Sequence, residues 1–172
     1  EAAQQRFVDA LARRLSELGV YGVNLDFEEV AAADRDRYTA FVRRLADAVH
    51  ARGLKLSIDL IRGDKAWNHL TAYDHEKIAE AVDYIMIMAY DQYWSGSTKP
   101  GSVSGLAWTE QGIIDYLSYG IPRSKLFLGV PLYVREWKVD KAGNVIGSRA
   151  VLMKDIPALL AEVDETTSFD PA

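Results

Sequence analysis

Residues 20–28 read VYGVNLDFE, a segment in which polar and apolar side chains alternate. Because successive side chains of a strand point to opposite faces, this segment predicts a strand with Asn24, Asp26 and Glu28 on one face. The preceding residues 5–18 carry phenylalanine and leucine at helical spacing, which predicts an amphipathic helix. The two segments together predict a helix followed by a strand that ends at Glu28.

Helical and strand patterns keep alternating beyond this segment. Helices are predicted over residues 38–49, 76–82 and 109–117, and strands over residues 54–60, 84–90 and 126–130. Strands that alternate with helices predict right-handed βαβ units and a parallel sheet. The pattern changes after Pro131, where residues 137–146 predict a hairpin that turns at residues 142–144. Residues 151–163 predict a last helix, kinked by Pro157.

The fold class expected from this order is α/β. No glycine-rich nucleotide-binding motif lies at a strand-to-helix junction, which disfavours doubly wound nucleotide-binding folds. A β/α barrel fits better, but a complete one takes about 250 residues and eight strands. This chain has 172 residues and about half as many strands, so it is either a small open sheet or part of a barrel.

Composition excludes several functions. The chain has 25 acidic and 20 basic residues and no basic block, so we expect neither a nucleic-acid nor an anionic-membrane surface. It has no cysteine, which excludes disulfides, thiolate nucleophiles and zinc-thiolate sites. No apolar run approaches the length of about 20 residues that spans a bilayer. The first residues carry charge throughout and show no secretory signal peptide.

The polar face of residues 24–28 is the strongest candidate site. Active sites of β/α folds gather at the carboxyl ends of strands, where Asp26 and Glu28 are expected. Like charges at short range resist joint ionisation, so we expect a raised pKa for Glu28, which would donate a proton, and an ionised Asp26. The alternative is structural: the two carboxylates cap helices or pair with Arg37 or Lys55.

Three motifs resemble glycoside hydrolase family 18, the chitinases and their relatives. YGVNLDFEEV at residues 21–30 resembles the D-G-x-D-x-D-x-E signature of that family, MAYD at residues 88–91 its M-x-Y-D motif, and GVPLY at residues 129–133 its G-x-P-x-Y motif. The resemblance covers most of residues 7–137. The wording DYIMIMAYD, followed by a loop that contains tryptophan, is most similar to bacterial spore and cell-wall members.

The resemblance implies a (β/α)8 barrel that hydrolyses chitin or peptidoglycan, which are polymers containing N-acetylglucosamine. Members of this family retain configuration by substrate assistance. Glu28 would then protonate the glycosidic oxygen and later activate water, while Asp26 would orient the acetamido nitrogen. Tyr90 and Asp91 would hold the acetamido group.

Further residues are expected to contact the glycan. Trp94 and Tyr133 would stack on sugar rings, and Met88 would form the floor of the sugar site. Asn24 stands where the signature has an acid, and Tyr21 replaces another acid, which would weaken the proton relay behind Asp26. This chemistry needs no metal and no cofactor, so a glycan is the expected partner.

The resemblance also implies that only part of the barrel is present. Residues 1–134 would form about strands four to seven, and residues 135–172 the start of an insertion subdomain, with a hairpin and a helix. A partial barrel exposes unpaired strand edges, which predicts self-association through them. The expected location is extracellular, at a cell wall or spore. A glycan-binding barrel without turnover, or an inactive piece of the enzyme, are the alternatives.

Four other polar residues receive structural interpretations. His50 is expected to interact with a helix dipole, and His69 and His75 to lie on the surface. Asp59 is expected to form a salt bridge with Lys55 or Arg62.

Overall fold

The computed structural model describes residues 2–161. Its helices and strands, in chain order, are α1 (Ala2–Leu18), β1 (Gly22–Leu25), α2 (Arg35–His50), β2 (Lys55–Ile61), α3 (Lys65–Asn68), α4 (His75–Ala81), β3 (Tyr84–Met88), α5 (Leu106–Ser118), β4 (Leu126–Leu128), β5 (Tyr133–Val139), β6 (Val145–Leu152) and α6 (Ile156–Leu160). Short 3-10 turns cover Ala32–Asp34, Arg123–Lys125 and Met153–Asp155.

The described chain divides into two compact units. The first comprises residues 2–88 and 112–128 and contains the strands β1 to β4. The second comprises residues 89–111 and 129–161 and contains the hairpin β5–β6.

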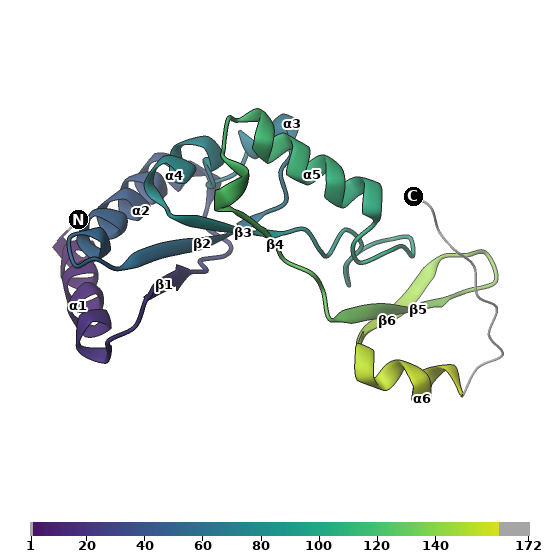
Figure 1. The fold of residues 1–172 in the computed structure, drawn as a ribbon. Coiled ribbons are helices and arrows are strands. Elements are labelled where there is room, and N and C mark those ends of the chain that lie inside the picture. Colours follow the sequence, from purple (N-terminus) through teal and green to yellow (C-terminus); the bar gives the residue numbers. More distant parts are fainter. Residues whose placement is uncertain (1, 162–172) are drawn as a thin grey trace. The chain divides into compact units, whose positions relative to one another are not determined.

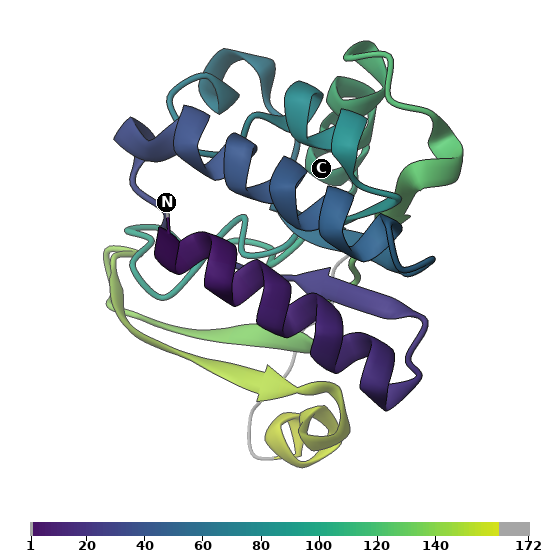
Figure 2. The same ribbon diagram turned by 90° about the vertical axis from the view of Figure 1, so that its left-hand side faces the viewer.

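The first unit is built on a parallel sheet with the strand order β1-β2-β3-β4, as the sequence predicts. Helices α2 and α4 lie on one side of this sheet (Figure 1), and α1 lies alongside α2 (Figure 2). Gly22 is required where β1 approaches β2, because a Cβ atom there would lie 2.1 Å from the carbonyl oxygen of Lys55.

The core of the first unit lies between the sheet and α2. Strand β2 alternates as predicted: Leu56, Ile58 and Leu60 are fully buried, whereas the side chains between them are half-buried on the other face. Residues of α2 at helical spacing, including Leu45, are buried against them. Burying each of these leucine and isoleucine side chains contributes about 1.5–3 kcal/mol. The opposite face of the sheet is thereby left to polar side chains.

Strand β1 is shorter than predicted. It ends at Leu25, so the prediction that the strand reaches Glu28 is wrong, and Asp26 and Glu28 lie in the loop that follows. Two features characterise the loop that replaces the rest of the predicted strand. Glu29 has a left-handed backbone conformation with φ +56°, and the hydroxyl of Tyr73 takes the Phe27 carbonyl oxygen as its hydrogen-bond acceptor. Neither feature leaves a mark in the local hydrophobic pattern.

One of the three histidines lies where the sequence did not place it. His75 is fully buried, so the prediction of a surface position is wrong, whereas His69 is exposed as predicted. The His75 ring stacks on Tyr116, with 4.6 Å between ring centroids. His50, at the end of α2, forms an ion pair with Asp83 at 2.7 Å.

The second unit contains the predicted hairpin. Strands β5 and β6 pair in antiparallel fashion, and the carboxylate of Asp140 accepts hydrogen bonds from the backbone of Ala142 and Asn144 in the turn. The predicted last helix is wrong at its start, because β6 continues to Leu152 and α6 begins at Ile156. Pro157 therefore lies in the first turn, where its missing N–H is tolerated. The predicted end at Val163 lies outside the described residues.

Within residues 2–161, the structure contains no helix that combines the length and the hydrophobicity needed to cross a membrane.

Candidate active site

The loop of residues 26–30, which follows β1, carries the two candidate acids. Asp26 and Glu28 are both exposed, and among the described residues neither forms an ion pair. The structural alternative, pairing with Arg37 or Lys55, is wrong, because these two cations pair with Asp34 and Asp83. The carboxylates are therefore available to a ligand or to water.

The backbone of this loop is held by a tyrosine. The hydroxyl of Tyr73 donates a hydrogen bond to the Phe27 carbonyl oxygen at 2.9 Å and accepts one from the Val30 N–H at 3.3 Å. Burial raises the pKa of Tyr73, and the negative charges of Glu28 and Asp26 raise it further, although the bond from Val30 opposes them. The tyrosine therefore remains protonated and able to donate.

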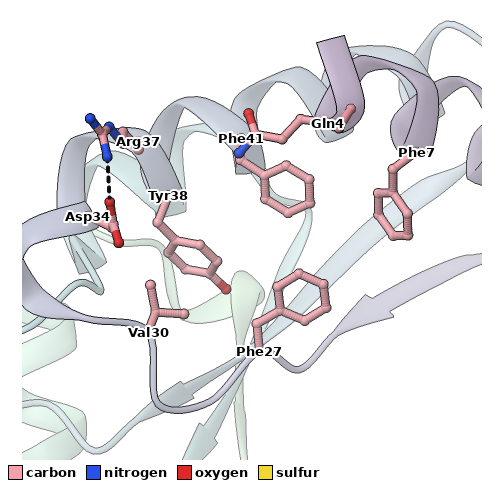
Figure 3. A pocket seen from close by; sticks show the side chains of 9 residues that line it. Gln4, Phe7, Phe27, Val30, Asp34, Arg37, Tyr38 and Phe41 are labelled. Atoms are coloured by element: carbon pink, nitrogen blue, oxygen red, sulfur yellow. Dashed lines mark hydrogen bonds and ion pairs between the residues drawn. The ribbon is translucent and has the colours of Figure 1, made fainter. Parts of the chain in front are cut away.

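Apolar side chains hold the same loop on its other side. The Phe27 ring stacks on the Phe41 ring with 5.8 Å between centroids and 9° between planes. Figure 3 shows Phe27 and Val30 pointing toward Tyr38 and Phe41 of α2, with Phe7 of α1 beyond. These side chains line a cavity of about 590 Å³. The loop thus directs Phe27 and Val30 toward α2, although Phe27 stays 44% exposed, while Asp26 and Glu28 remain exposed.

A second polar group lies on the open face of the sheet. Asn24 of β1 pairs in register with Ser57 of β2, and the Ser57 hydroxyl donates a hydrogen bond to Asn24 Oδ1 at 2.7 Å. Burial raises the pKa of Asp59, the Asn24 amide lowers it, and the negative charge of Asp26 raises it. The expected salt bridge from Asp59 to Lys55 is wrong, since Lys55 Nζ lies 2.7 Å from Asp83. Asp59 instead belongs to the surroundings of Asp26.

The second unit holds the candidate residues that follow β3. Asp91 has a left-handed backbone with φ +56°. Its Oδ1 accepts a hydrogen bond from the Tyr133 hydroxyl at 2.7 Å and lies 4.0 Å from the guanidinium of Arg135. Burial raises the pKa of Tyr133, and its donation to Asp91 raises it further. Tyr90, which precedes Asp91 in the sequence, is half-buried, and the Trp94 side chain is 56% exposed.

The predicted site residues therefore fall into separate local groups. The first unit holds the predicted residues Asn24, Asp26, Glu28 and Met88, the last at the end of β3, and the second unit holds Tyr90, Asp91, Trp94 and Tyr133. Ser57 and Arg135 were missed, although each lies at period two from a residue that was singled out. Tyr73 was missed because nothing in its local sequence marks it. No three His, Asp or Glu side chains gather to hold a metal ion within residues 2–161.

Comparison with known proteins gives a consistent result. The family described as Glycosyl hydrolases family 18 matches residues 1–171. The Bacillus subtilis protein YdhD, named a sporulation-specific glycosylase, is 34% identical over 149 residues, which is 85% of this chain and 34% of that protein. The cortical fragment-lytic enzyme of Bacillus subtilis is 27% identical over 173 residues, which is 99% of this chain and 40% of that protein.

Solved structures agree. A chitinase from Chromobacterium violaceum superposes with a TM-score of 0.87 and 31% identity, covering 98% of this chain and 52% of that one. The likeness supports an α/β fold of the TIM-barrel type. The chain spans about a third to a half of the length of these relatives. The family match over nearly the whole sequence confirms the resemblance seen in the three motifs, and the chain belongs to glycosyl hydrolases family 18.

Proposed function

We propose that this chain supplies catalytic residues of a retaining glycoside hydrolase that cleaves β-1,4-linked N-acetylglucosamine polymers, with peptidoglycan favoured over chitin. The single observation that carries the proposal is that Asp26 and Glu28 are exposed and form no ion pair within residues 2–161, in a loop after β1 whose backbone is held by two hydrogen bonds to Tyr73. Membership of family 18 supports the assignment. In this proposal the sheet corresponds to about strands four to seven of a barrel.

In the proposed mechanism, Glu28 donates its proton to the glycosidic oxygen as the bond from that oxygen to the anomeric carbon breaks. The acetamido oxygen of the same sugar attacks the anomeric carbon and forms an oxazolinium ion. Asp26, as an anion, stabilises the positive charge that develops on the acetamido group. The oxygen of a water molecule then attacks the anomeric carbon while the Glu28 carboxylate takes a proton from that water. The bond from the anomeric carbon to the acetamido oxygen breaks, which opens the oxazolinium ring, restores the acetamido group and gives overall retention.

In this proposal, residues of the second unit bind and orient the sugar. Tyr90 and Asp91 would hydrogen-bond the acetamido group, and Tyr133 would keep Asp91 oriented through its 2.7 Å bond. Trp94, exposed in its loop, would stack on a sugar ring. In the first unit, Met88 and Asn24 would contact the glycan. The names of two relatives, sporulation-specific glycosylase and cortical fragment-lytic enzyme, support a location at a spore or cell wall.

Product analysis of the natural protein tests this function. Incubation with chitin oligomers and with purified peptidoglycan should release new reducing ends, and proton NMR should show retained β-configuration in the first product. Oligomers deacetylated at the reacting sugar should resist cleavage, because they lack the acetamido nucleophile. Inverted product, or equal cleavage of the deacetylated oligomer, would contradict the mechanism. Binding without new reducing ends would instead indicate a glycan-binding barrel.

A further inference from the structure

We infer that Tyr73 is a positioning residue for Glu28: its hydroxyl fixes the peptide groups at the two ends of the segment Glu28-Glu29, and so sets the direction in which Glu28 points. The inference rests on the proposed function of Glu28. Tyr73 is distant in sequence from the loop that it holds, and it reaches no reacting atom itself.

The geometry of the contact carries the inference. One hydroxyl serves both partners, as donor to the Phe27 carbonyl oxygen at 2.9 Å and as acceptor from the Val30 N–H at 3.3 Å. Glu28 and Glu29 lie between these two peptide groups. Because both ends of the segment are attached to one oxygen atom, neither peptide plane can rotate without breaking a hydrogen bond.

The backbone between the two contacts needs such support. Glu29 has φ +56°, a left-handed conformation that carries a steric cost for a residue with a Cβ atom. Phe27 adds a second restraint through its stacked contact with Phe41. With the hydroxyl removed, the stacked ring would still hold the start of the loop, but nothing would fix the Val30 N–H. Glu28 would then sample several directions.

Tyr73 is itself rigidly anchored. Its carbonyl oxygen accepts a hydrogen bond from the buried Asn68 side chain at 2.7 Å, and its N–H bonds Thr71 Oγ1 at 3.2 Å. Arg35 of α2 donates to the carbonyl oxygens of both Asn68 and Thr71, at 2.9 and 2.8 Å. The hydroxyl is therefore attached through a continuous set of hydrogen bonds to the helix that covers the sheet.

A matched pair of tyrosines makes the inference testable. The ring of Tyr38 meets the ring of Tyr73 edge to face at 5.5 Å. The Tyr38 hydroxyl is buried and has no hydrogen-bond partner among the residues described here. Tyr38→Phe and Tyr73→Phe therefore remove the same atom from neighbouring rings, but only the second breaks the contacts with Phe27 and Val30.

The experiment compares both variants in the natural protein. Tyr73→Phe should lower kcat by roughly 10- to 100-fold with little change in KM, because misplacing a catalytic group by about 1 Å costs this much. It should also raise the hydrogen-exchange rate of the Val30 amide at least about tenfold, since its acceptor is gone. Tyr38→Phe should change neither quantity. Incorporating 4-aminophenylalanine at position 73 restores the donor to the Phe27 carbonyl oxygen but only a weak acceptor for the Val30 N–H, and should recover part of the lost kcat.

The two readouts separate failure of the inference from failure of the proposed function. An unchanged Val30 exchange rate, or a raised rate with unchanged kcat while Glu28→Gln is inactive, would overturn the inference. An equal loss of kcat in Tyr38→Phe would overturn it as well. If Glu28→Gln retained turnover, the proposed function would fail, while the Val30 exchange rate would still report whether Tyr73 holds the loop.

Discussion

Two loops at the carboxyl ends of parallel strands, residues 26–30 after β1 and the segment after β3 that carries Asp91, restrain their acids in different ways. Each contains a non-glycine residue with φ +56°, Glu29 in the first and Asp91 in the second, and these are the two such residues in the described chain. Strained backbone conformations concentrate at functional sites, where the surrounding contacts maintain them. Both loops therefore have the local signature of a site.

The restraints in the two loops differ in whether they occupy the carboxylate groups. In the first loop Tyr73 binds backbone groups, and the carboxylates of Asp26 and Glu28 make no hydrogen bond or ion pair within residues 2–161. In the second loop the restraint acts on the carboxylate itself, since Tyr133 donates to Asp91. An acid with no donor attached can exchange a proton, whereas an acid already bound is suited to hold a ligand. Under the proposed function, this difference favours proton transfer by an acid of the first loop and substrate orientation by Asp91 of the second.

Asp26→Asn, in the loop after β1, should produce a large loss of kcat. Removing the negative charge that opposes the oxazolinium ion should lower kcat by about 100-fold, or about 3 kcal/mol in the activation barrier. Steady-state kinetics on chitin oligomers and peptidoglycan measure the change. Asp36→Asn, at an exposed position of α2, is the control and should retain activity. Equal activities of the two variants would remove Asp26 from the mechanism.

Acid should destabilise the first unit through His75, which is fully buried in it. Burial, followed by the positive charge of Arg35, lowers the pKa of His75 from 6.5 to about 3. Between pH 6.5 and about pH 3, His75 is protonated in the unfolded chain and neutral in the folded chain. The free energy of unfolding therefore falls as the pH falls through this range.

The expected size is about 2 kcal/mol less free energy of unfolding at pH 5 than at pH 7. Urea titrations at the two pH values measure it. His75→Phe should abolish most of this difference, whereas His69→Gln, at an exposed position, should preserve it. A pH dependence that survives in His75→Phe would contradict the assignment.

Tyr133→Phe should have the smallest effect, because it weakens the orientation of Asp91 and leaves the proton donor intact. Losing the 2.7 Å hydrogen bond to Asp91 should lower kcat/KM about tenfold, or about 1.4 kcal/mol. Tyr93→Phe removes a hydroxyl in the same unit and is the control. A loss larger than that of Asp26→Asn would reverse the ranking of the two loops.

The sequence predicted the parts of the fold that depend on local pattern. The alternation in residues 54–60 predicts β2, because Leu56, Ile58 and Leu60 must face the helices. It could not predict that β1 ends at Leu25, since the group that binds the loop, Tyr73, lies 46 residues from Phe27. The burial of His75 likewise depends on Tyr116, 41 residues away.

The candidate site shows the same division. Glu28, Asp91 and Tyr133 were predicted from motifs whose residues are close in sequence. The contacts that restrain them come from other elements. Tyr133 and Asp91 were both singled out, whereas Tyr73, which holds the loop of Glu28, was not. The prediction that Glu28 lies in a strand is wrong. Glu28 is nevertheless exposed to solvent, because the loop after β1 leaves its side chain uncovered.

The central claim is that Glu28 transfers the proton, and Glu28→Gln in the natural protein tests it most directly. Glu29→Gln alters the exposed neighbour in the same loop and is the matched control. Glu28→Gln should release no new reducing ends from chitin oligomers or peptidoglycan while still binding them, and Glu29→Gln should remain active. Turnover by Glu28→Gln at the rate of Glu29→Gln would show that Glu28 does not transfer the proton.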